Sequence, residues 1–395
     1  MLVKLRFSNF YSFYEETEIS FELGKKPSPS AYDIEVAPAR RLNKVVAVVG
    51  PNASGKTQLI KPLAFLSWFI KSSYLGSKPD APIQFQPHAL HQDENSEFEL
   101  TFMFKGKEYR YKLVVNRKQV IHESLHYKSS RLFSYIFVRE LVEGDAYSCK
   151  QQGFGFSTSR ARRTRGNASL ISAAYSYDVV LASELAGHFN EYSFNLNISG
   201  RQNYGGADIL RSAEYFINDK EHHAHMEQLM CDFDLGICSI KINEAELEDS
   251  QGNISKVFLP MGVHTVGDKV FELPFFEESS GTQSAFVLLR RILPVLKNGG
   301  VAIIDEIDND LHPHMLPHIM DLFKFEHTNP HQAQLIFTCH TPEVLNLLRK
   351  HQVYLVEKRE QQSEAWRLDE VSGLRADDNL YAKYMAGALD AVPNL

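Results

Sequence analysis

The clearest hydrophobic pattern in the chain is a set of short, uninterrupted apolar runs that end in polar residues or glycine. "KVVAVVG" (44–50) is mostly β-branched and ends in glycine, whereas "GGVAIIDE" (299–306) and "QLIFTCH" (334–340) end in carboxylates and a histidine. Such runs are typical of strands buried on both faces of a parallel sheet. Ligands bind outside the carboxyl ends of these strands, so the three ends are predicted to converge on one site.

Alternating and helical patterns fill much of the remaining chain. "LVKLRFSNF" (2–10) and "TEISFEL" (17–23) predict strands, and residues 98–115 alternate on both sides of Lys105-Gly106-Lys107, which predicts a β-hairpin. Helical periodicity surrounds 173–189 and 209–233.

These patterns predict an α/β fold with a mixed sheet, an antiparallel β subdomain and a mainly helical insertion. The predicted divisions are an N-terminal lobe at 1–125, a largely helical insertion at 126–260, a C-terminal lobe at 261–358 and a tail at 359–395.

Composition adds limits to this picture. The 395 residues are 44% hydrophobic and 23% charged, which is ordinary for a globular protein, and the net charge of −7 argues against a surface that coats nucleic acid throughout. The four cysteines form no C-x-x-C pair, and no apolar stretch is long enough to cross a bilayer. We therefore expect a cytoplasmic protein with no membrane partner.

The segment "GPNASGKT" satisfies the P-loop pattern G-x-x-x-x-G-K-[ST] between a predicted strand and a predicted helix. Its glycines let backbone N–H groups face a phosphate, its lysine reaches the β- and γ-phosphate oxygens, and its threonine hydroxyl can hold Mg²⁺. The sequence thus predicts ATP and Mg²⁺ as ligands. The predicted nucleotide-binding residues here are Gly50, Pro51, Asn52, Ala53, Ser54, Gly55, Lys56, Thr57 and Gln58.

"VAIIDEID" has the apolar strand and the carboxylates expected of a Walker B element. Asp305 is predicted to hold Mg²⁺ together with Thr57. Glu306 is predicted to orient or deprotonate the attacking water, which makes it, with Lys56, a candidate catalytic residue.

A second anion-binding turn, "ESSGTQ" (278–283), precedes a run of helix formers. Together with "DND" (308–310) after the Walker B carboxylates and His340 at the next strand end, it resembles the signature motif of the ABC-type ATPases. The resemblance is to the branch of AAA-family proteins that contains RecF, SMC/Rad50 and OLD-like proteins. It covers about 1–125 and 255–358, and the 126–260 region is too short for the coiled-coil arms of SMC or Rad50.

The resemblance implies roles for further residues. In the family, the signature turn binds the γ-phosphate of ATP held by the partner subunit, and Ser279 and Gly281 match its serine and second glycine. Asp308 matches the D-loop, and His340 matches the switch histidine that contacts the γ-phosphate. Either Gln84 or Gln86 fits the Q-loop, and Gln86 is preferred as a Mg²⁺ ligand.

The resemblance also implies partners. The site requires at least a homodimer, and a higher ring is open. The chain resembles compact ATPases of the AAA_15 and AAA_21 types, many of which belong to anti-phage defence operons, and the nearest in size and layout is the ATPase component of PARIS-type systems. Too little chain follows His340 to hold a TOPRIM domain. The predicted function is therefore a sensor or switch subunit that responds to a phage trigger protein and controls a separately encoded TOPRIM-type nuclease.

A RecF-like ATPase that clamps DNA for repair or maintenance is the alternative. The polar stretch "QQGFGFSTSRARRTRGNAS" (151–169) reads as an exposed loop, and its arginines could bind a nucleic acid backbone or an acidic protein. A solvated loop explains them at least as well, and the acidic net charge of the chain favours it slightly.

Overall fold

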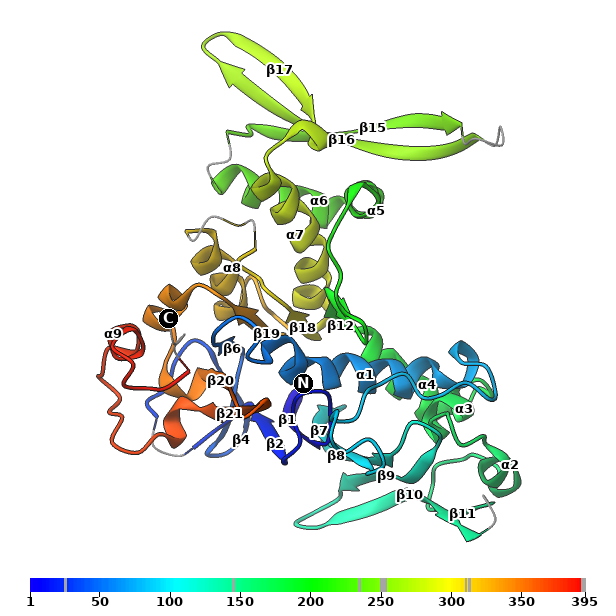
Figure 1. The fold of residues 1–395 in the computed structure, drawn as a ribbon. Coiled ribbons are helices and arrows are strands. Elements are labelled where there is room, and N and C mark those ends of the chain that lie inside the picture. The colour runs from blue at the N-terminus through cyan, green and yellow to red at the C-terminus, as the bar shows by residue number, and fades with distance from the viewer. Residues whose placement is uncertain are drawn as a thin grey trace.

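The structure is a computed structural model of the chain, and it describes residues 1–24, 27–143, 146–233, 236–248, 254–309, 311 and 314–391. Two large sheets dominate it, one mixed and one antiparallel, and helix α1 (Lys56–Gly76) lies between them (Figure 1). The predicted α/β fold class, with a mixed sheet and an antiparallel subdomain, is confirmed.

The mixed sheet carries the predicted strand ends. Its strands, in spatial order, are β12 (Tyr192–Phe194), β18 (Val301–Ile304), β19 (Gln334–Cys339), β6 (Val45–Val49), β20 (Val353–Arg359) and β21 (Gln362–Arg367). All neighbours are parallel except β20 and β21. Because β19 lies between β6 and β18, the carboxyl ends of the three predicted strands are adjacent.

Alternate side chains of β6 enter two different hydrophobic cores. Val46 and Val48 pack in the core that also contains α1, whereas Val45, Ala47 and Val49 pack in the core that contains α7 and α8. This strand is therefore buried on both faces, as its uninterrupted apolar sequence predicts.

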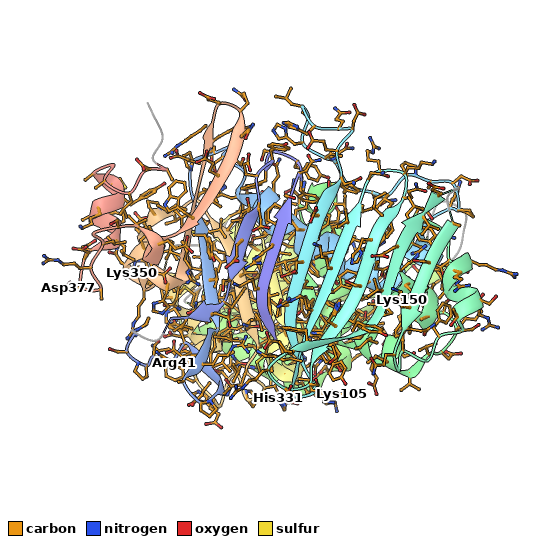
Figure 2. The ribbon with its side chains drawn as sticks, turned by 90° about the horizontal axis from the view of Figure 1, so that it is seen from below. Arg41, Lys105, Lys150, His331, Lys350 and Asp377 are labelled. Atoms are coloured by element: carbon orange, nitrogen blue, oxygen red, sulfur yellow. The ribbon has the colours of Figure 1, made fainter. Side chains whose placement is uncertain are left out.

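The antiparallel sheet lies beyond α1, and its strands run side by side across the face seen from below (Figure 2). In spatial order they are β11 (Ala146–Gln151), β10 (Phe133–Val142), β9 (Val120–Lys128), β8 (Lys107–Val115), β7 (Ser96–Phe104), β1 (Leu2–Ser8) and β2 (Thr17–Ser20). The predicted hairpin is confirmed as β7–β8, and its turn residues Lys105 and Gly106 both have positive φ, as a tight hairpin turn needs. A small sheet contains β3 (Glu22–Leu23), β5 (Arg40–Asn43) and β4 (Asp33–Ala37).

Helices cover both faces of the mixed sheet. The remaining α-helices are α2 (Thr158–Arg163), α3 (Leu170–Tyr175), α4 (Val180–Asn190), α5 (Gly206–Asn218), α6 (Lys220–Asp232), α7 (Ser280–Asn298), α8 (Met315–Lys324) and α9 (Leu380–Met385). Short 3-10 helices span Phe275–Glu277, Pro342–Asn346, Lys350–Gln352 and Leu368–Glu370. Helices α3 and α4 contact α1, whereas α5 and α6 contact α7 on the other face.

A three-stranded antiparallel arm projects beyond α5, α6 and α7 (Figure 1). It consists of β15 (Ser239–Glu248), β16 (Ile254–Val266) and β17 (Lys269–Pro274). The arm leads directly into the turn that precedes α7, so it lies beside the predicted signature motif.

The predicted divisions at 1–125, 126–260, 261–358 and 359–395 remain predictions as domain limits. The sheets nevertheless extend across all three boundaries between these ranges. Strands β9, β10 and β11 extend the antiparallel sheet to residue 151, and β12 joins the mixed sheet. The predicted helices follow: α3 and α4 lie between β11 and β12 in the chain, and α5 and α6 come after β12. In the predicted tail, β21 pairs with β20. None of the helices in the described part of the chain is long and apolar enough to span a membrane.

His188 on α4 makes stability sensitive to acid. Its ring stacks on Phe102 at 5.4 Å, and burial lowers the pKa of His188 to about 3. Below pH 6.5 the unfolded chain binds a proton that the folded chain excludes, so stability falls by about 1.4 kcal/mol per pH unit until about pH 3. We expect His188→Phe to flatten this loss in urea unfolding between pH 7 and pH 4. Parallel curves for the two proteins would contradict the assignment.

Candidate functional site

The P-loop joins β6 to α1, and two of its glycines are structurally required. Gly55 has φ +114, and a Cβ there would lie 2.4 Å from the Ser363 hydroxyl oxygen; a Cβ on Gly50 would lie 2.2 Å from the Val356 carbonyl oxygen. Strands β20 and β21 therefore pack closely against the loop, which curves tightly beside them. The loop thus has the tight path expected of a phosphate-binding loop. Only glycine, which has no Cβ atom, can follow this path at these two positions.

The P-loop lysine lies within the curve of the loop. Lys56 is 5% exposed, and its Nζ donates to the carbonyl oxygens of Gly50 at 2.7 Å and Pro51 at 2.9 Å. Burial lowers the pKa of Lys56, whereas the negative charges of Glu306, Asp305 and Asp308 oppose that shift. The ammonium group therefore lies in the field of the three predicted carboxylates.

Thr57 and Asp305 are in direct contact. The Thr57 hydroxyl donates to the Asp305 carboxylate at 2.8 Å, and the buried Thr338 hydroxyl donates to Asp305 Oδ1 at 2.6 Å. Burial raises the pKa of Asp305, and these two hydrogen bonds act in the opposite direction. A hydroxyl oxygen beside a carboxylate is a donor set that suits Mg²⁺, so the residues fit the predicted metal.

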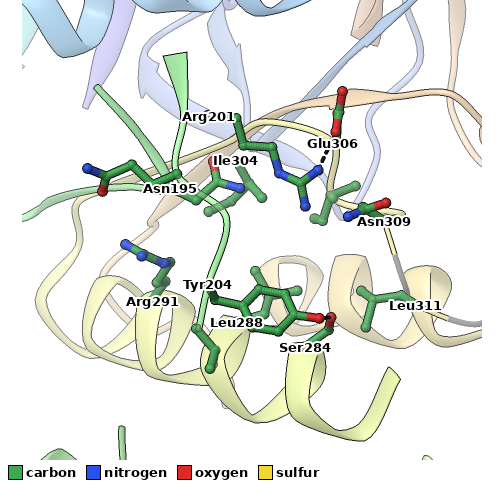
Figure 3. Close-up of a pocket in the computed structure, with 13 residues that line it drawn as sticks. Asn195, Arg201, Tyr204, Ser284, Leu288, Arg291, Ile304, Glu306, Asn309 and Leu311 are labelled. Atoms are coloured by element: carbon green, nitrogen blue, oxygen red, sulfur yellow. Dashed lines mark hydrogen bonds and ion pairs between the residues drawn. The ribbon is translucent and has the colours of Figure 1, made fainter. Parts of the chain in front are cut away.

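Glu306 follows Asp305 at the end of β18, with φ +49. Its Oε1 lies 3.1 Å from His340 Nε2, and its Oε2 accepts a hydrogen bond from Arg201 Nη1 (Figure 3). Its backbone N–H donates to the Thr338 hydroxyl at 2.7 Å. Burial alone would raise the pKa of Glu306, but the hydrogen bond from His340 and the charge of Arg201 outweigh it and lower the pKa.

Asp308 connects the Walker B segment to the residues after β19. Its Oδ2 accepts from the backbone N–H of His340 at 3.0 Å and from the backbone N–H and hydroxyl of Thr341 at 2.8 and 2.6 Å. Burial alone would raise the pKa of Asp308, but these hydrogen bonds outweigh burial and lower the pKa. Asp308 therefore fixes the backbone of His340, the predicted switch histidine; Asp310, the last residue of the predicted D-loop, lies outside the described residues.

The signature turn is exposed at the start of α7. The Ser279 hydroxyl caps this helix by accepting from the Thr282 backbone N–H at 3.2 Å, and Gly281 lies in the first turn. The contacts described for the turn are with its own helix, with Tyr204 and, through Glu278, with His264 of β16, and none is with the P-loop of the same chain. Ser279 is thus exposed, and Gly281 beside it is half-buried.

Other predicted residues lie at the margin of the site. Gln84 and Gln86 are both exposed, and the Gln86 carbonyl accepts from the Tyr11 backbone N–H at 2.9 Å. Gln58 contacts the Ser12 hydroxyl, which also lies 2.6 Å from Ser363. The role of Gln86 as a metal ligand remains a prediction.

The predicted exposed arginine loop was wrong in part. Residues 158–163 form α2, and Arg165 is a partly buried cap of α1 whose Nη2 donates to the carbonyls of Ser73, Tyr74 and Ser77. The guanidinium of Arg160 lies 4.3 Å from the centre of the Tyr177 ring. An arginine that satisfies free carbonyls at a helix end has a structural role.

Three residues of the site were missed by sequence reasoning: Asn195, Arg201 and Tyr204. They come from the region 126–260, which was treated as an insertion. Asn195 bonds to the backbone of Asp305, Arg201 contacts Glu306, and Tyr204 contacts α7. The one signal in the sequence was the short run "YSF", which forms β12. Because β12 pairs with β18, it brings these residues to the edge of the mixed sheet.

Comparison with protein families agrees with this geometry. A family model described as "AAA domain, putative AbiEii toxin, Type IV TA system", AAA_21, matches residues 45–346. The chain belongs to this family. The matched range includes the whole region 126–260, and membership of this ATPase family implies nucleotide binding.

Two of the solved structures that are similar to this AAA_21 chain are Smc head domains. One is described as "Crystal structure of the SmcHead bound to the C-winged helix domain of ScpA", with 12% identity, a TM-score of 0.48, and coverage of 93% of this chain and 97% of that chain. The other is an Smc head domain with an extended coiled coil bound to the C-terminal domain of ScpA, derived from Pyrococcus furiosus, with 12% identity, a TM-score of 0.46 and the same coverage. No curated protein matches the chain.

Thr338 is a test of how the Walker B carboxylates are held. The Thr338 hydroxyl donates to Asp305 and accepts from the Glu306 backbone N–H. Thr338→Val removes both hydrogen bonds and is therefore expected to lower the free energy of unfolding by about 1–3 kcal/mol. Thr338→Ser keeps the hydroxyl and is the matched control. Urea unfolding measures both; a Val variant as stable as the wild type would show that the two bonds are unimportant.

Proposed function

We propose that the protein hydrolyses ATP in a site completed by a second copy of the chain. The observation that carries the proposal is the convergence of Lys56, Thr57, Asp305, Glu306 and His340 at the adjacent ends of three parallel strands. Such an arrangement combines a phosphate cradle with a carboxylate positioned to act on water.

Each residue has a proposed role. Lys56 and the P-loop N–H groups bind the β- and γ-phosphates, and Thr57 with Asp305 holds Mg²⁺, which when bound withdraws charge from the phosphate oxygens. Glu306 orients the attacking water and accepts its proton. His340 donates to Glu306 and contacts the γ-phosphate.

The second copy supplies the signature turn. Ser279 is exposed and Gly281 is half-buried at the N-terminus of a 19-residue helix, which can receive an anion that comes from outside the protomer. A homodimer is therefore the smallest proposed active form, and two equivalent turns would serve two equivalent sites.

We further propose that ATP turnover drives a switch in an anti-phage defence complex. The family description refers to a toxin of a type IV toxin–antitoxin system, and this supports a role in a two-gene defence system. In this proposal the chain senses a phage trigger protein and controls a separately encoded effector, a TOPRIM-type nuclease.

Co-purification tests the effector proposal. Tagged Glu306→Gln protein, expressed from its native gene neighbourhood with ATP and Mg²⁺, is expected to retain a nuclease-like partner in fixed stoichiometry. Tagged Lys56→Ala protein is the control, because it should not form the ATP-bound state. Recovery of homodimer alone from the Glu306→Gln strain would contradict this part of the proposal.

The RecF-like alternative has narrower support. Two arginines, Arg162 and Arg163, are exposed on α2, while Arg160 and Arg165 make intramolecular contacts. If the protein clamps DNA through this surface, replacing Arg162 and Arg163 with Ala will weaken binding of a DNA duplex and reduce its salt dependence. Unchanged DNA affinity would remove this surface from consideration.

A further inference from the structure

A short segment connects the Walker B residues to the signature helix within one protomer. We call residues 195–204 the strap; it follows β12 and contains β13 (Leu196–Asn197) and β14 (Gly200–Arg201). Figure 3 shows it passing between α7 and the end of β18, with Arg201 pointing to Glu306 and Tyr204 pointing to Ser284.

The first part of the strap is bonded to the Walker B backbone. The Asn195 side-chain amide donates to the Asp305 carbonyl at 2.7 Å, and its oxygen accepts from the Asp305 N–H at 2.6 Å. The Tyr11 hydroxyl, from the loop after β1, donates to the Ile198 carbonyl at 2.7 Å. The strap is thus fixed at Asn195 and at Ile198, both of which precede Arg201 in the chain.

The middle of the strap holds the catalytic carboxylate. Arg201 bonds to Oε2 of Glu306 while His340 contacts Oε1, so both carboxylate oxygens are restrained. The side chain of Arg201 is 16% exposed and that of Glu306 is 30% exposed, which means that the ion pair is only partly solvated. A charge-assisted bond of this kind is stronger than a bond between neutral groups.

The end of the strap reaches the signature helix. The Tyr204 hydroxyl donates to the Ser280 carbonyl at 3.2 Å and also bonds to the Ser284 hydroxyl. Ser280 is the first residue of α7 and follows Ser279 directly. Only two residues, Gln202 and Asn203, therefore lie between the residue that contacts Glu306 and the residue that contacts the signature turn.

We propose that the strap positions Glu306 through Arg201 and links it, through Tyr204, to the signature turn of the same chain. The inference rests on the proposed function. In a dimer, this turn would contact ATP bound to the other copy. The strap would therefore connect the nucleotide bound to the other copy with Glu306 in the site of its own chain. Arg201 is a positioning residue, because it contacts Glu306 and not the P-loop.

Positioning explains why the arginine matters for turnover more than for binding. A carboxylate restrained at both oxygens keeps one orientation toward the attacking water, and small displacements of catalytic groups cost large factors in rate. Without Arg201, Glu306 keeps only the His340 contact. ATP binding, which depends on the P-loop and Lys56, should be preserved.

Steady-state ATP hydrolysis and ATP binding measured on Arg201→Met test this directly. We expect kcat to fall about 10- to 100-fold while the dissociation constant for ATP changes less than about twofold. Arg201→Lys should recover part of kcat because it restores the charge. Arg211→Met, which removes an exposed arginine of α5 that pairs with Asp208, is the matched control with expected wild-type kcat.

A kcat for Arg201→Met equal to or above that of the wild type would overturn the positioning role. Loss of ATP binding together with a lower melting temperature would also overturn it, because that pattern indicates a structural role. Both results differ from failure of the proposed function, in which Glu306→Gln would itself retain turnover.

Tyr204→Phe tests the link to the signature turn. Removing the hydroxyl is expected to lower kcat about three- to tenfold in the wild type. In the Arg201→Met background the same change should have little further effect, because contacts that act through one path are not additive. Independent, multiplicative effects of the two substitutions would contradict the link.

Discussion

Glu306→Gln is expected to lower ATP turnover about 100- to 10,000-fold while ATP binding is retained. Glutamine keeps the size and the hydrogen-bonding oxygen of the side chain but cannot accept a proton from water. Its amide also cannot form the ion pair with Arg201, and the contact with His340 changes from charged to neutral. Phosphate release and binding of a fluorescent ATP analogue measure the two properties separately.

The comparison with Asp308→Asn sharpens this test. Asp308 lies two residues beyond Glu306 and bonds to the segment after β19, so its replacement should disturb the site without removing the base. We therefore expect a smaller loss of turnover than for Glu306→Gln. Turnover by Glu306→Gln at the wild-type rate would remove the glutamate from the mechanism.

Ser279→Asp is expected to abolish hydrolysis without unfolding the helix it caps. Aspartate is as good an N-cap as serine, so α7 should keep its start. Its negative charge, however, would face the γ-phosphate of the partner's ATP and repel it. We expect turnover to fall about 100-fold or more, by analogy with the removal of a single preorganised donor at a transition state.

Ser279→Asn is the matched control for this change. Asparagine caps a helix equally well and carries no charge, so it should retain more activity than aspartate. ATP binding to the isolated protomer should be the same in all three proteins, because Ser279 is exposed and makes no described contact with the P-loop of its own chain. Equal turnover by Ser279→Asp and the wild type would contradict the proposed role of the turn.

The parts of the site that the sequence predicted share one physical property. Lys56, Asp305 and His340 each follow a strand whose sequence is apolar on both faces, and this pattern is typical of a parallel sheet that is covered on both sides. The ends of such strands meet at one edge. Local sequence therefore predicted both the strands and the convergence of their polar ends.

The strap could not be predicted in this way. Strand β12 has three residues, and its position beside β18 depends on a contact across about 110 residues of chain. The role of Arg201 arises only from that distant pairing. For the same reason, β9 to β11 were assigned to the insertion, since alternation predicts a strand but not the sheet that it joins.

Arg165 illustrates a second limit. The run of arginines at 160–165 looks like an exposed basic patch, but Arg165 caps α1, whose last turn contains no basic residue of its own. A sequence shows the charge of a side chain but not the free carbonyls that lie near it. The contact therefore became visible only in the folded chain.

Mixing two inactive variants tests the central claim, that ATP is hydrolysed between two copies, most directly. Lys56→Ala lacks phosphate binding and Ser279→Asp lacks a usable signature turn, so each should be inactive alone. In a randomly assorted mixture, half of the dimers contain one intact composite site, and activity should return to about a quarter of the wild-type value. A mixture that stays inactive, although heterodimers are shown to form, would contradict the account.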